Sequence, residues 1–163
     1  MALDMFIKMS NGISGESKDN DKATVGDIDV LAWSWGCSQS GTFHQGGGGG
    51  AGKANVQDIS FTKWIDKASP KLQLACLKGT HLDECVLNIR KAGDKPYVYL
   101  KITMAKCLIT SVSTGGSGGE DRLTENVTIN FAKVKVEYFE QGDTGAATAA
   151  GDFTFNIEKN VAE

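Results

Sequence analysis

The stretch LTENVTINFAKVKVEYFE, residues 123–140, decides the fold class. Its apolar residues alternate with polar ones, which is the period of a β-strand. The alternation changes phase once, between a first set, Val127, Ile129 and Phe131, and a second set, Val134, Val136 and Tyr138. A strand changes its buried face in this way at a β-bulge, here near Ala132, or where it passes from one sheet to another. Both arrangements are typical of sheets that curve into barrels.

The same alternation predicts further strands along the chain. In-phase groups are Met5, Ile7 and Met9; Ile59, Phe61 and Ile65; Cys85, Leu87 and Ile89; and Phe153, Phe155 and Ile157. In residues 27–36 one face carries Leu31, Trp33 and Trp35, and the other carries Ile28, Val30, Ala32 and Ser34. The segment 97–113 is long and rich in β-branched and aromatic residues. We therefore expect a mainly β chain, with residues 1–163 forming a single barrel domain.

One helix is predicted beside these strands. Ser69 suits the N-cap, Pro70 suits the first helical position, and Gly79 suits the C-terminal stop. Leu72, Ala75 and Cys76 have the i, i+3, i+4 spacing of a face that packs on the core.

Loops are expected at 10–27, 40–53, 113–122 and 141–151, where polar residues and glycines accumulate. The second loop contains five consecutive glycines, Gly46 to Gly50, and the third contains Gly115, Gly116, Gly118 and Gly119. Ordering so much glycine costs backbone entropy, and long loops in a small domain usually serve a function. Self-assembly is one such function, because a neighbouring subunit would order the loop.

The sequence GGGGAGKA, residues 47–54, resembles a phosphate-binding loop but lacks two of its requirements. Ala54 stands where a Ser or Thr would hold magnesium. The segment leads into an alternating β pattern, so no helix N-terminus presents amides to a phosphate. We expect no nucleotide cofactor.

Composition excludes several other classes of protein. The net charge is −3 and the basic residues are dispersed, which argues against a nucleic-acid partner. No apolar run approaches the ~18 residues of a membrane helix, so no membrane partner is expected. Residues 1–10 do not have the pattern of a secretory signal. We therefore expect cytoplasmic assembly and, if the protein is secreted, a route that needs no signal peptide.

Cysteine and histidine patterns indicate neither a metal site nor catalysis. Cys37, Cys76, Cys85 and Cys107 form no CxxC pair, and we expect reduced thiols that serve as small apolar residues. His81 lies between two of the cysteines, but the spacing matches no zinc site. Neither His44 nor His81 adjoins a recognisable nucleophile, so we do not expect an enzyme.

Five blocks of the sequence stand out together: IDVLAWSWG (28–36), SQSG (38–41), GGGGGAGKANVQDISFTKWIDKASPKL (46–72), IRKAG (89–93) and SVSTGGSGGEDRLTENVT (111–128). These blocks resemble the Hcp (haemolysin-coregulated protein) family, the tube proteins of type VI secretion systems. The resemblance covers residues 4–160, and the segment 142–151 fits it least.

The resemblance implies a β-barrel of two antiparallel sheets with one side helix, related to phage tail tubes. It also implies homohexameric rings that stack into a hollow tube. A contractile sheath would drive this tube, with a VgrG-type spike at its tip, and small effector proteins would travel in the lumen. An alternative is a ring-forming soluble effector chaperone or adaptor that does not polymerise. A third possibility, an enzyme or toxin, has no catalytic motif to support it.

The expected site residues follow from loop composition and strand alternation. Ser34 is expected to face the lumen and contact effectors, because the small residues around it would leave a smooth, uncharged surface. Ring-stacking or subunit contacts are expected from two loops, through Gly46, Gly47, Gly48, Gly49, Gly50 and Lys53 in one and Gly115, Gly116, Gly118 and Gly119 in the other.

Overall fold

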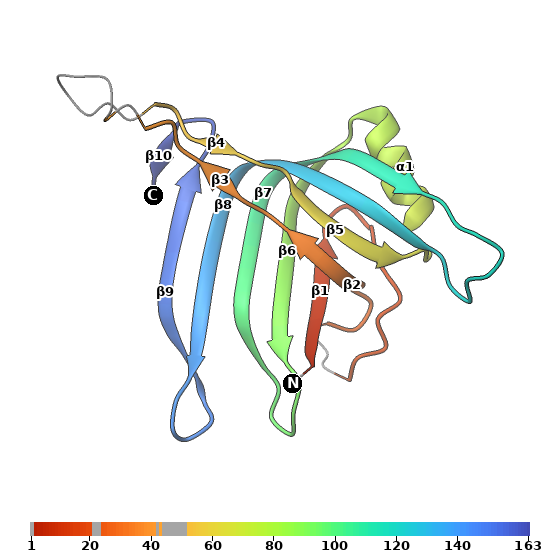
Figure 1. Cartoon of the computed structure of the whole chain (residues 1–163), viewed down its shortest axis with the longest axis horizontal. Helices are drawn as coiled ribbons and strands as arrows, with labels where there is room; N and C mark the ends of the chain where they lie inside the picture. Colours follow the sequence, from red (N-terminus) through yellow and green to blue (C-terminus); the bar gives the residue numbers. More distant parts are fainter. Residues whose placement is uncertain (1, 21–23, 42, 44–51) are drawn as a thin grey trace.

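The computed structural model describes residues 2–20, 24–41, 43 and 52–163. Within them the chain forms ten strands and one helix (Figure 1). In chain order these are β1 (Leu3–Met9), β2 (Ile28–Ser34), β3 (Cys37–Ser38), β4 (Asn55–Val56), β5 (Ile59–Trp64), α1 (Ser69–Lys78), β6 (His81–Lys91), β7 (Tyr97–Thr114), β8 (Thr124–Gln141), β9 (Ala147–Asn156) and β10 (Val161–Ala162).

Six of these strands close a barrel. Pairing runs from β8 through β5, β2, β1 and β6 to β7, and β7 pairs back with β8. β9 and β10 continue the sheet beyond the second half of β8, while β3 and β4 form a small separate sheet. The predicted mainly β barrel with one side helix is confirmed. Its two layers belong to one hydrogen-bonded antiparallel sheet, because the long strands β7 and β8 run through both (Figure 1).

Three neighbouring strands turn a corner at the same level of the barrel. Along each of them, two buried residues flank a pair that is not buried: Leu82 and Cys85 on β6, Met104 and Cys107 on β7, and Phe131 and Val134 on β8. β8 changes one of its partners here, from β5 up to Ile129 to β9 from Lys133. The register between β7 and β8 continues unbroken past this point. Of the two predicted causes of the phase change, the passage between layers is therefore the correct one.

A β-bulge between Val30 and Ala32 resets the alternation of β2. Val30 is buried, Trp33 and Trp35 pack against the core, and Ala32 and Ser34 are exposed. The prediction that Ser34 shares a face with Val30 is wrong, because the bulge shifts every later side chain to the other face. Ser34 does lie opposite the two tryptophans, as predicted.

The helix begins at Ser69, one residue earlier than predicted. Ala68 occupies the N-cap and Ser69 is the first helical residue, so the prediction of a Ser69 cap is wrong. Gly79 ends the helix with φ of 63°, and its N–H donates to the carbonyl of Cys76 at 3.3 Å. The predicted core-facing residues Leu72 and Ala75 are buried.

The expected loop at 141–151 is mostly strand. β9 begins at Ala147, and its first residues pair with the end of β8, for example Ala149 with Phe139. Only residues 142–146 connect the two strands. Small polar residues are sufficient to form this part of β9, because backbone hydrogen bonds to β8 hold it at the edge of the sheet.

The segment between β1 and β2 is tied to the barrel. Ile13 joins the core, and Arg90 of β6 binds Asp19 at 2.5 Å and Asp4 at 3.1 Å. The charged Arg90 also stacks over the Phe6 ring at 5.2 Å, which accounts for its burial.

Candidate functional site

Four strands of the barrel present an outward surface of small polar side chains, which we call the polar face. The strands are β2, β5, β8 and the second half of β7, and the cross-strand register aligns their residues in rows. One row is Ser34, Ser60, Thr128 and Ser111, and the next is Ala32, Thr62, Asn126 and Ser113. Side chains directly opposite each other on neighbouring strands are in contact distance, so the rows form a continuous surface.

Hydrogen bonds between side chains hold this surface in place. Thr62 donates its hydroxyl to Asn126 at 2.7 Å, and the hydroxyls of Ser111 and Thr128 share a hydrogen bond of 2.6 Å. Farther along β7 and β8, Thr110 and Asn130 donate to the two carboxylate oxygens of Asp58 at 2.7 and 2.8 Å. Asp58 is the charged group of this network, and its oxygens are occupied. The side chains of the polar face are therefore held in place by hydrogen bonds to one another.

Both side edges of the polar face lack a strand partner within the described residues. β2 pairs with β1 only at Ile28 and Asp29, so residues 31–34 bond to β5 alone. β7 pairs with β6 only as far as Leu108, so residues 109–114 bond to β8 alone. Unpaired strand edges are templates for pairing with another chain.

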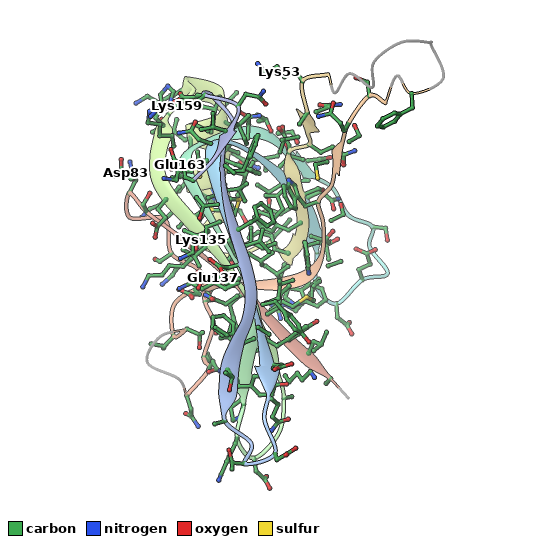
Figure 2. All side chains as sticks on the ribbon, turned by 90° about the vertical axis from the view of Figure 1, so that its left-hand side faces the viewer. Lys53, Asp83, Lys135, Glu137, Lys159 and Glu163 are labelled. Atoms are coloured by element: carbon green, nitrogen blue, oxygen red, sulfur yellow. The ribbon has the colours of Figure 1, made fainter. Side chains whose placement is uncertain are left out.

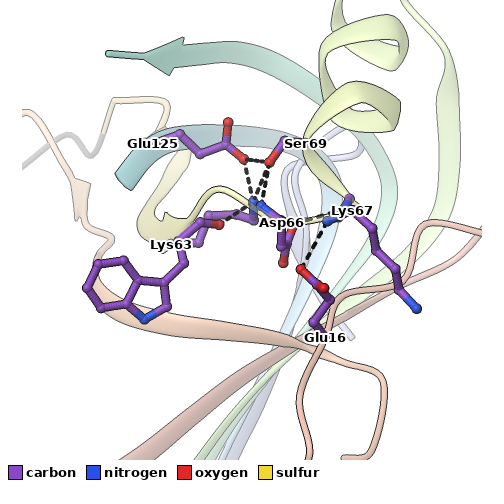
Figure 3. Close-up of polar contacts among 8 residues, drawn as sticks. Glu16, Lys63, Asp66, Lys67, Ser69 and Glu125 are labelled. Carbon is purple, nitrogen blue, oxygen red and sulfur yellow. Dashed lines mark hydrogen bonds and ion pairs between the residues drawn. The ribbon is translucent and has the colours of Figure 1, made fainter. Parts of the chain in front are cut away.

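A buried cluster of charges lies directly beneath the polar face (Figure 3). Lys63 and Glu125 form an ion pair and both are 0% exposed. Lys63 also binds Asp66 at 2.9 Å and Ser69 at 3.1 Å, and Ser69 donates to Glu125 at 2.5 Å. The cluster fixes the start of α1 to β5 and β8 on the side opposite the polar face.

Sequence reasoning missed this cluster, although the sequence contains a signal for it. Lys63 is in phase with the buried Ile59 and Phe61, and Glu125 is in phase with Val127. A lysine and a glutamate that both fall on core positions are expected to pair with each other.

The predicted glycine residues of the 113–122 loop lie beside the β7 edge. Gly115, Gly116, Gly118 and Gly119 are all in the exposed connection from β7 to β8. Gly116 packs against Leu123: a Cβ there would lie 2.2 Å from a terminal methyl group of the Leu123 side chain, which would have to move. The other three glycines have open space around them.

The predicted residues of the 40–53 loop are only partly described. Gly46 to Gly50 and His44 lie outside the described residues. Lys53, labelled in Figure 2, is exposed. It lines a cleft of about 730 Å³ together with His81, Lys106 and Glu158. The floor of the cleft is apolar and includes Phe131 and Ile157. The cleft brings Lys53 near His81 but not near Ser34.

The cysteines are free thiols in two different settings. Cys85 and Cys107 are 0% exposed in the core, as small apolar residues are, whereas Cys37 is exposed, contrary to the expectation. A hydrogen bond with Cys107, together with burial, raises the pKa of the Cys85 thiol.

Among the described residues no group of three or more His, Cys, Asp or Glu side chains is placed to hold a metal ion. No helix in that part of the chain is long and apolar enough to cross a membrane.

Comparison with known proteins identifies the family. The sequence pattern described as "Type VI secretion system effector, Hcp" matches residues 6–138. Protein hcp1 of Pseudomonas aeruginosa is 58% identical over 163 residues, which cover 99% of each chain. The chain belongs to the Hcp family.

Solved Hcp structures share the whole fold. A structure of a type six secretion system protein superimposes with a TM-score of 0.90 and 30% identity, covering 99% of this chain and all of the other. Hcp1 from Salmonella typhimurium has a TM-score of 0.79 and 35% identity, with complete coverage of both chains. The protein is a subunit of the type VI secretion tube, and the Hcp family is a family of structural, self-associating and secreted proteins.

Proposed function

We propose that this Hcp protein forms hexameric rings whose inner wall is the polar face, and that these rings stack into a hollow tube that carries small effector proteins. The observation that carries the proposal is a four-stranded polar surface whose two outer strands, β2 and β7, each have one edge without a strand partner. A closed ring needs such a pair of complementary edges on every copy.

Ring closure follows from joining the two edges. The free edge of β2 in one copy would pair with the free edge of β7 in the next, through residues 31–34 and 109–114. This contact is head-to-tail, and head-to-tail contacts close into a ring when the rotation between copies permits. The sheets of all copies would then form one continuous wall around a channel.

The chemistry of the polar face suits transient carriage of protein cargo. Hydroxyl and amide groups such as Ser34 and Asn126 can bond to many different surfaces. Each exposed hydrogen bond contributes only about 1 kcal/mol, because water competes for it. Cargo would therefore be retained by many weak contacts with Ser34 and its row, and released once the ring leaves the cell.

The glycine-rich loops would make the contacts between rings. Gly46 to Gly50 and Lys53 belong to the connection between β3 and β4, and a loop rich in glycine can lie across a neighbour with little bulk. The connection with Gly115 and Gly118 adjoins the β7 edge and would contribute to the subunit contact. A VgrG-type spike and a contractile sheath would complete the machine. Assembly would take place in the cytoplasm, and export would need no signal peptide.

Substitution of Ser34 by glutamine tests the lining of the channel. The longer side chain would project into the lumen, so effectors recovered with purified rings should fall by about tenfold, equivalent to ~1.4 kcal/mol. Ring yield should not change, because the proposed pairing of β2 with β7 uses backbone groups, whereas the Ser34 side chain would point into the channel. Ser38→Gln, at an exposed serine on β3 outside the polar face, is the matched control. Unchanged effector recovery with Ser34→Gln rings would refute a role for Ser34 in cargo contact.

A further inference from the structure

Two buried cysteines meet at the corner that β6 and β7 turn together. Cys85 of β6 and Cys107 of β7 are both 0% exposed and belong to the same core cluster. Met104 lies directly across from Cys85 in the register of the two strands, and the Cys107 thiol donates a hydrogen bond to the Met104 carbonyl at 3.4 Å. The Cys107 sulfur is therefore held beside the residue that faces Cys85.

A turn in the backbone of β7 brings this sulfur to the inside of the corner. Met104 and Cys107 are an odd number of positions apart, so regular alternation would place them on opposite faces of the strand. Lys106 between them has φ of 54°, in the left-handed region that a lysine rarely adopts. This residue rotates the strand, and both Met104 and Cys107 are buried as a result.

The two thiols are joined by a hydrogen bond in which Cys85 is the donor. This bond raises the pKa of Cys85, and the same bond, together with the backbone N–H of Cys85, lowers the pKa of Cys107. The thiolate is the reactive form of a cysteine. Cys107 is therefore the sulfur that reacts first, with Cys85 placed to follow it.

A cleft leads to the side chains around Cys107. Leu82 and Phe131 lie across from Cys107 on its two neighbouring strands. Lys106 and Leu108 flank it along β7. All four of these neighbours line the cleft of about 730 Å³. Cys107 thus lies directly beneath the floor of the cleft, and a small local opening of the corner would let a small molecule reach its sulfur.

We propose that Cys85 and Cys107 form a disulfide when the folded protein meets hydrogen peroxide, and that this bond locks the corner between the two layers of the barrel. Attack by the Cys107 sulfur breaks the O–O bond of the peroxide and gives a sulfenic acid and one water molecule. Attack by the Cys85 sulfur on the sulfenic sulfur then forms the S–S bond and releases a second water molecule. The two thiol hydrogens and two electrons all pass to the peroxide, so no other reactant is needed.

The proposed function supplies the place where the lock would close. Thiols stay reduced in the cytoplasm, whereas disulfides persist outside the cell. A ring would therefore assemble with free thiols and gain the cross-link after export. This use of the lock rests on the proposed function, but the reaction itself needs only the folded subunit. The cross-link would join β6 to β7 across residues 85–107 and restrict the unfolded chain, which makes the subunit harder to unfold.

The test treats the purified complete protein with hydrogen peroxide and locates disulfides by mass spectrometry. Peroxide is removed first, and the remaining thiols are alkylated as the protein unfolds, so that no new bond forms during digestion. Wild type is compared with Cys107→Ala and with a Cys37→Ser, Cys76→Ala double variant. The double variant keeps the buried pair and lacks the exposed and the half-buried thiol. Urea denaturation is measured for oxidised samples and for samples reduced with dithiothreitol.

We expect a bond between Cys85 and Cys107 in wild type and in the double variant, and its loss on reduction. Oxidation should lower the equilibrium constant for unfolding by at least about tenfold in these two proteins and leave that of Cys107→Ala unchanged.

Oxidation of Cys37 in wild type with Cys85 and Cys107 still unlinked would overturn the proposal. A cross-link that leaves resistance to urea unchanged, or lowers it, would overturn the lock. Failure of the protein to form rings would instead refute the proposed function alone, because the bond and its effect on unfolding are measured equally well on single subunits.

Discussion

Asp27 is a buried carboxyl group with an incomplete set of partners. It is 6% exposed, and its Oδ2 atom has no hydrogen-bond partner among the described atoms. Burial raises the pKa of Asp27 to about 6, an effect that the positive charge of Lys8 partly offsets. The folded state therefore binds this proton more tightly than the unfolded state does. Its charged form destabilises the fold above pH 6, and this loss is recovered as the pH falls toward 4.

Asp27→Asn should stabilise the protein at pH 7.5 and not at pH 4. A shift of about two pKa units corresponds to less than ~3 kcal/mol, and partial screening by solvent reduces the expected gain to about 1 kcal/mol. Urea denaturation at the two pH values measures the difference. Asp94→Asn, at an exposed hairpin residue, is the control. A loss of stability at pH 7.5 that is absent at pH 4 would contradict this account, because it would show that the charged carboxylate stabilises the fold.

At the scale of elements, the attachment of α1 depends on the buried charge cluster. Lys63 and Glu125 are supplied by β5 and β8, and Ser69 by the first turn of α1 (Figure 3). The pair is fully enclosed, so its net contribution to stability is small compared with the cost of breaking it.

Removing both partners of this pair should cost less than the sum of the two single removals. Glu125→Leu or Lys63→Met alone leaves a buried charge without its main partner and should cost about 3 kcal/mol or more. The double variant should cost clearly less than the sum of the two, which a double-mutant cycle in urea measures. The exposed pair Lys106 and Glu158, 3.3 Å apart, is the matched control and should show coupling below about 1 kcal/mol. Additive losses for Lys63 and Glu125 would mean that they do not act as a pair.

Element-level features differ in how far the sequence reveals them. The passage of β8 between layers could be predicted, because the phase change from Phe131 to Val134 is visible in the sequence. The bulge after Val30 could not be predicted, since an extra residue leaves no mark in composition. The first half of β9 was missed for a different reason: this part of the strand buries little apolar surface, so it has no alternating apolar pattern to detect.

At the scale of the molecule, strand alternation predicts only part of the polar face. Ser34 could be predicted to point away from the tryptophans of its own strand. Its alignment with Ser60, Thr128 and Ser111 could not, because register across strands far apart in the chain is set by the closed barrel. The resemblance to the Hcp family predicts the tube function. The pairing register of β2, β5, β8 and β7 aligns the residues of the surface on which that function would depend.

The most direct test of the whole account is a cryo-electron microscopy reconstruction of the purified, assembled protein. We expect closed hexameric rings in which β2 of one subunit pairs with β7 of the next and the row from Ser34 to Ser111 faces an open channel. A protein that stays monomeric at every concentration, or rings in which this row faces the outside, would contradict the account.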